Sequence, residues 1–225
     1  MNRIKYIAFV IVFLIGSAVQ AQLENDQDIS KVGTTAAQFL KISSGGRGLA
    51  MGSANVAITN NLSSSFWNPA GLAHLKGIQV YFENNGWLAG TDYNFGSFGF
   101  EWPLVGVLSL SITMLTTPDD LVRTIEKPTG TGEKFNAQDM SIGISIAKSL
   151  TNQLSLGASI KNIRQRIWHS TGQTIATDIG VQYKTPIKDI ILGASISNFG
   201  NDISLIGRDM NLSVDPDPNL SLIHI

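Results

Sequence analysis

The chain has no cysteine among its 225 residues. A disulfide framework and lipid attachment through cysteine are therefore excluded, and stability outside the cytoplasm has to come from packing, sheet closure or a membrane. Charge is also scarce, since 15% of the residues are charged and the net charge is -1. This balance gives no electrostatic footprint for nucleic acid, and the low charge favours a buried or lipid-facing chain.

Long apolar runs are missing too, except at the start of the chain. Asn2, Arg3 and Lys5 precede an apolar run over residues 7–15, and small residues at Val19 and Ala21 fit a cleavage site. The alternative is a membrane anchor, but the run is shorter than the ~20 residues that a spanning helix needs. We therefore predict a secretory signal peptide over residues 1–21.

Apolar residues recur at every second position from residue 78 onward. Residues 106–116 place Leu108, Leu110 and Ile112 on one face of a strand and small polar residues between them on the other. The same alternation, with more aromatics in the first two runs, predicts seven strands over residues 78–84, 92–102, 106–116, 139–149, 154–161, 175–183 and 190–197.

The predicted strands are typical of an all-β, transmembrane antiparallel β-barrel. Several run for about ten residues, and their polar face is mostly Ser, Gly, Thr and Ala, whereas a soluble sandwich, the alternative, commonly carries Lys, Glu and Arg there. Short connections alternate with long polar ones, predicted at residues 117–138, 164–173 and from 200 onward. Aromatics near the strand ends fit two interfacial girdles: Trp87, Trp102, Trp168, Tyr183 and Phe199.

Seven strands would leave an open edge, which a sheet in hydrocarbon cannot tolerate. The last residues also follow a loop rich in proline and aspartate, residues 215–218. We therefore expect the sequence to stop about halfway round a larger barrel, so that residues 78–225 form a partial barrel.

Residues 22–77 do not alternate and are interrupted by glycines. We predict that they form an N-terminal hatch, a glycine-kinked plug in the barrel lumen. A nucleotide-binding loop at Gly46 and Gly48 fails on spacing. Asn68-Pro69 predicts a rigid corner, because proline fixes its own φ and holds the preceding residue extended; a capped helix start is the alternative, and the two are compatible.

Two stretches in this segment carry a resemblance to a known family. "FLKISSGGRGLAMGSANVAI" and "SSFWNPAGLA" resemble the amino-terminal signature of FadL-like outer-membrane proteins, especially the PorV/PorQ branch of the Bacteroidetes. The resemblance runs from about Gly33 to about Asp217 and implies fourteen strands around a hatch. The family's Asn-Pro-Ala motif maps onto Asn68, Pro69 and Ala70, the corner that would lead the hatch into the first strand.

The resemblance also implies location and function. Members lie in the outer membrane of Gram-negative cells, in contact with its lipid. The branch is associated with type IX secretion, so we expect a protein that assists secretion or surface handling of exported proteins, with those proteins or secretion-system components as partners. The alternative is a FadL-like channel for long-chain fatty acids or other hydrophobic ligands. A lateral gap for such a ligand could arise at Gly96 and Gly99, although packing against the hatch also explains these glycines.

Nothing in the sequence indicates an enzyme. The three histidines, His74, His169 and His224, lack the paired spacing of a zinc site. Acidic residues in the predicted outer loops lack the spacing of calcium ligands and are expected to be solvated: Asp119, Asp120, Asp202, Asp209, Asp215 and Asp217. We therefore predict no catalytic residues, no metal and no cofactor.

Overall fold

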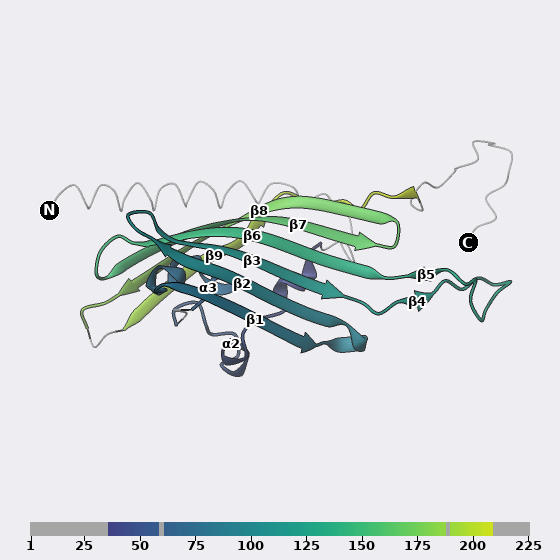
Figure 1. The fold of residues 1–225 in the computed structure, drawn as a ribbon, viewed down its shortest axis with the longest axis horizontal. Helices are drawn as coiled ribbons and strands as arrows, with labels where there is room; N and C mark the ends of the chain where they lie inside the picture. The colour runs from purple at the N-terminus through teal and green to yellow at the C-terminus, as the bar shows by residue number, and fades with distance from the viewer. Residues whose placement is uncertain (1–35, 59–60, 188–189, 209–225) are drawn as a thin grey trace, which may run out of the picture. The chain divides into compact units, whose positions relative to one another are not determined.

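The computed structural model describes residues 36–58, 61–187 and 190–208. The predicted signal peptide and the proline-rich loop at residues 215–218 lie outside these ranges. Seven strands form one sheet in the order β1-β2-β3-β6-β7-β8-β9, and each is antiparallel to its neighbour (Figure 1). Their bounds are β1 Ile78–Gly86, β2 Asp92–Trp102, β3 Gly106–Thr116, β6 Ala137–Ser149, β7 Leu154–Ile167, β8 Ser170–Lys184 and β9 Ile191–Gly200. The prediction of an all-β antiparallel fold with seven strands is confirmed.

The two faces of this sheet have opposite character. The face that contacts the N-terminal segment, residues 36–77, is called the covered face, and the other is the bare face. Ser145 on the covered face is 2% exposed, whereas Ile144 beside it on the bare face is 59% exposed. The same contrast holds for Ser159 at 6% and Ile160 at 53%. The predicted alternation is therefore confirmed, with the small polar residues covered and the large apolar residues bare.

One predicted loop is wrong. β7 and β8 stay paired through residues 164–173, as far as Ile167 opposite Ser170, and Trp168 turns the chain with a φ of 51°. The polar residues of this stretch suggested a loop, but Arg164 and Arg166 are strand residues near the end of a long hairpin. The polar residues mark the end of the apolar surface on these strands, but the backbones of β7 and β8 stay paired beyond that point.

The connection between β3 and β6 contains a second, two-stranded sheet. It pairs β4 (Asp120–Leu121) with β5 (Lys134–Phe135) and projects beyond the ends of the main strands (Figure 1). We call residues 117–136 the arm. The β1–β2 connection holds a short 3-10 helix, η3, at Leu88–Gly90.

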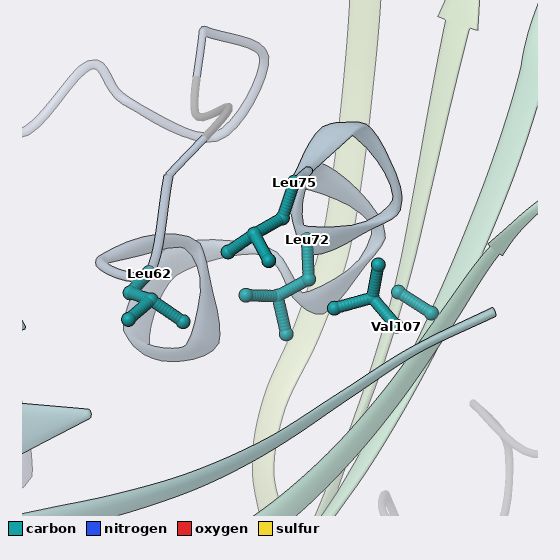
Figure 2. Close-up of a cluster of buried hydrophobic side chains, with 5 residues drawn as sticks. Leu62, Leu72, Leu75 and Val107 are labelled. Atoms are coloured by element: carbon teal, nitrogen blue, oxygen red, sulfur yellow. The ribbon is translucent and has the colours of Figure 1, made fainter. Parts of the chain in front are cut away.

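The N-terminal segment is built from short helical turns. They are η1 Gln38–Lys41, α2 Gly46–Ala50, α3 Ser64–Trp67 and η2 Pro69–His74. Of these turns, η2 makes most of the contacts with the covered face, and α2 projects away from the sheet (Figure 1). Leu62, Leu72 and Leu75 pack against Val107 of β3 and Ala147 of β6 (Figure 2). A second cluster joins Phe39 and Leu40 to Ile163 and Ala176 of the sheet. Among the described residues, no helix has the length and hydropathy to cross a bilayer.

Candidate functional site

The Asn68-Pro69 corner joins the N-terminal segment to the sheet. Asn68 is extended, with φ −155° and ψ 105°, and Pro69 occupies the first position of η2. The Asn68 Oδ1 atom accepts a hydrogen bond from the Ala70 N–H at 3.0 Å. Its Nδ2 group donates to the carbonyl oxygens of Val56, at 2.9 Å, and of Val181 in β8, at 3.1 Å. The corner and the capped helix start are therefore both present, and one side chain holds three parts of the chain together.

The sheet receives this corner in a recess made by glycines on its covered face. Gly157 of β7 lies directly opposite Gly180 of β8. A Cβ atom on Gly157 would overlap the backbone of Pro69 and Ala70, and one on Gly180 would overlap the Asn68 Oδ1 atom. These contacts require a residue without a side chain at both positions.

The recess continues onto β9. A Cβ atom on Gly193 would lie 2.7 Å from the Cα atom of Ala57 and 2.7 Å from the carbonyl oxygen of Val56. We call Gly157, Gly180 and Gly193 the glycine recess. The alternation along the sequence puts all three on the small-residue face, but it does not by itself identify a docking site. Their signal in the sequence is a glycine on the same face of three successive strands.

Polar side chains of the sheet fasten the segment at further points. Glu83 of β1 accepts hydrogen bonds from the Ser44 hydroxyl at 2.8 Å and from the Gly45 N–H at 2.6 Å. Gln165 of β7 accepts from the Ala37 N–H at 2.9 Å. Gln182 of β8 donates to the Ala57 carbonyl oxygen at 3.0 Å. The segment is thus tied to one edge strand, β1, and to β7 and β8 in the interior of the sheet.

A buried ion pair crosses three strands beside the recess. The Lys161 Nζ atom lies 2.6 Å from Asp178 Oδ2, and the two side chains are 9% and 1% exposed. Lys161 also donates to Asn198 Oδ1 at 3.2 Å, and Asp178 accepts from the Asn198 N–H at 2.7 Å. Asn198 has a φ of 58°, and the β8–β9 register shifts there, which marks a β-bulge. The carboxylate therefore neutralises the lysine and holds the bulge.

The lateral gap at Gly96 and Gly99 stays a prediction, and both residues lie within β2. β2 pairs with β1 and with β3 through both residues without a register shift. Gly99 faces the N-terminal segment, where a Cβ atom would lie 2.6 Å from Leu62 Cδ2. Gly96 lies on the bare face near Ile112. Close packing, the other explanation for Gly99, is the one that the geometry supports.

A cavity of about 600 Å³ lies between the N-terminal segment and the covered face. Hydroxyls predominate among its polar lining groups, with lysine side chains and the amide of Asn198. Phe66 and Trp67 contribute aromatic rings from the segment, and Phe95 contributes one from β2. The hydroxyl side chains are those of Ser43, Ser53, Ser65, Ser111, Thr113, Ser141, Ser195 and Ser197.

The histidines and loop carboxylates that the structure describes stay apart from this cavity. His74 lies in η2, 3.5 Å from the Ser155 hydroxyl, and His169 stacks on Trp168 in the β7–β8 turn; His224 lies outside the described residues. Asp120 pairs with Arg123 on the exposed arm. Within the described ranges, no group of three or more potential ligands could hold a metal ion.

No family model matches this chain, and no curated protein matches it significantly.

Proposed function

We propose that the sheet is part of an outer-membrane β-barrel of the PorV/PorQ type, with the N-terminal segment as its hatch. The observation that carries this proposal is the opposite character of the two faces. Bare-face residues of adjacent strands form an apolar surface that is half exposed or more, for example Leu110, Ile144, Ile160 and Ile179. Soluble proteins rarely expose continuous apolar surface of this kind, whereas lipid stabilises it.

The topology restricts how such a sheet could close. Six antiparallel pairings separate β1 from β9, so the two edge strands run in the same direction. Closure with antiparallel pairs alone therefore needs an odd number of additional strands. A barrel of fourteen strands meets this condition, since it would add seven to the seven described here. Hydrocarbon makes closure obligatory, because each unpaired backbone group there costs several kcal/mol.

In this proposal the protein assists type IX secretion or handles exported proteins at the cell surface. The glycine recess and the polar ties fix the hatch on the covered face, and half of the residues that line the cavity beside it carry a hydroxyl. A carrier of fatty acids needs an apolar pocket instead. The arm supplies a surface away from the sheet, where the side chain of Ile125 is 97% exposed. An exported protein could dock there.

Affinity capture tests this role directly. The full-length protein, cross-linked in its own cells and purified, should recover exported proteins or secretion-system components. A variant with residues 118–135 replaced by a short Gly-Ser linker should recover fewer exported proteins while its sheet remains intact. Recovery of no such protein by either form would contradict the secretion role. Copurification of fatty acid in its place would favour the hydrophobic carrier.

Insertion into a membrane has its own test, the substitution Ile144→Arg. Ile144 lies mid-strand on the bare face, between Leu110 and Ile160 of the neighbouring strands. Arginine near the midplane of a bilayer costs about 2–4 kcal/mol. We expect much less protein to resist a urea wash of the outer membrane. Ile125→Arg in the arm, at a side chain that is 97% exposed, is the matched control and should insert normally. Equal behaviour of the two variants would instead indicate a surface in water.

A further inference from the structure

The cavity on the covered face contains hydroxyls that have no partner. The Thr113 side chain is on β3 and the Ser141 side chain is on β6, and the two residues are 5% and 4% exposed. Within the described part of the chain neither forms a side-chain hydrogen bond, and both line the cavity. The Ser195 hydroxyl of β9, which also lines it, is buried and has no partner. Buried polar groups are normally paired, so these hydroxyls point to a polar ligand or to water.

Aromatic rings line the same cavity. Phe66 lies edge-on to Trp67, with ring centroids 5.2 Å apart, and edge-on to Phe95 at 6.1 Å. The Trp67 ring is held by a hydrogen bond from its Nε1–H to the Ser44 carbonyl oxygen at 2.8 Å. These rings are therefore preorganised, which lowers the entropy cost of binding.

Of the two lysines at the cavity, one is neutralised and the other is exposed. Lys161 contributes to the lining, but Asp178 lies 2.6 Å from its ammonium group. Lys41 also lines the cavity and is exposed to solvent. The inner lining is therefore built from neutral donors and acceptors beside aromatic rings.

We propose that this cavity binds a saccharide. Sugar hydroxyls both donate and accept, as do the free hydroxyls of Thr113 and Ser141. The C–H face of a pyranose can lie against the aromatic rings while its rim reaches these hydroxyls. The volume of about 600 Å³ falls within the 300–1,000 Å³ of small-molecule pockets. An acyl chain would instead bury the hydroxyls without partners, which is unfavourable.

A glycan array tests this assignment. The full chain should be purified in a detergent without a sugar headgroup and applied to an array of mono- and oligosaccharides, and the strongest ligand then measured by titration calorimetry. The double variant Thr113→Val and Ser141→Ala keeps the shape of the wall and removes two hydroxyls. We expect it to bind this saccharide roughly tenfold more weakly or worse. Laurate, added as a competitor, should not displace the sugar.

Ser109→Ala is the matched control. Ser109 is also on β3, is 4% exposed and has an unpartnered hydroxyl, but it does not line the cavity. Its removal should leave saccharide affinity unchanged. Binding of no saccharide, equal affinity of the double variant and the parent, or displacement by laurate would each overturn the proposal. The measurement is independent of membrane insertion and of secretion, so the role proposed above can fail or hold separately.

Discussion

Replacing Gly157 with alanine should lower the free energy of unfolding by about 3 kcal/mol, at the upper end of the usual cost of overpacking. The added methyl group would meet the backbone of Pro69 and Ala70, which cannot rotate away as a side chain could. The corner would have to leave the recess. The Asn68 hydrogen bonds to Val56 and Val181 would be lost with it.

Limited proteolysis provides the measurement, because an undocked N-terminal segment exposes its backbone to cleavage. The Gly157→Ala protein should lose residues 36–77 to the protease much faster than the parent, while the main sheet survives. Gly86→Ala is the control, since Gly86 is also a strand glycine and a Cβ atom there meets nothing within 4 Å. Equal rates of cleavage in the two variants would show that the recess does not hold the segment.

Asp178→Ala should be at least as damaging, with an expected loss of roughly 3–5 kcal/mol. It leaves the Lys161 ammonium group buried without its partner, which lies 2.6 Å away in the parent. It also removes the acceptor for the Asn198 N–H at the bulge. Thermal unfolding of the purified protein measures the loss.

Two further variants test whether burial of the ion pair and the unpaired lysine charge cause this loss of stability. Asp120→Ala breaks an ion pair with Arg123 whose side chains are 58% and 56% exposed, so its cost should stay below about 1 kcal/mol. The double variant Lys161→Met and Asp178→Leu removes both charges and should be more stable than Asp178→Ala alone. A melting temperature for Asp178→Ala no lower than that of Asp120→Ala would contradict the role of the pair.

The strands and the orientation of their faces were predictable because both depend on neighbours in sequence. Side chains alternate across a strand, so Leu110 and Ser111 had to face opposite ways once a strand was assumed. The β7–β8 hairpin was less predictable. Arg164 and Gln173 are paired strand residues, but their polarity is also typical of a loop. Local sequence could not distinguish the two, since hydrogen bonding to the neighbouring strand decides the outcome.

The Asn68-Pro69 corner was predictable as local geometry, but its partners were not. Asn68 bonds to Val181, which is 113 positions away. Gly157 and Gly180 look like any small residues in an alternating strand, and their purpose depends on the corner that fills them. Lys161 and Asp178 likewise occur on the polar faces of separate strands. Their pairing follows from the register of β7 with β8, which fixes which side chains become neighbours.

The two faces of the sheet also differ in the substitutions that they can accept during evolution. In the proposed barrel the bare face meets fluid lipid, which has no fixed shape to match, so leucine, valine or phenylalanine could replace Ile144 or Ile160. A surface that meets folded backbone must keep its contours, and Gly157 and Gly180 have no substitute there. Related sequences should therefore vary at the bare-face positions of each strand and stay constant at the covered-face positions.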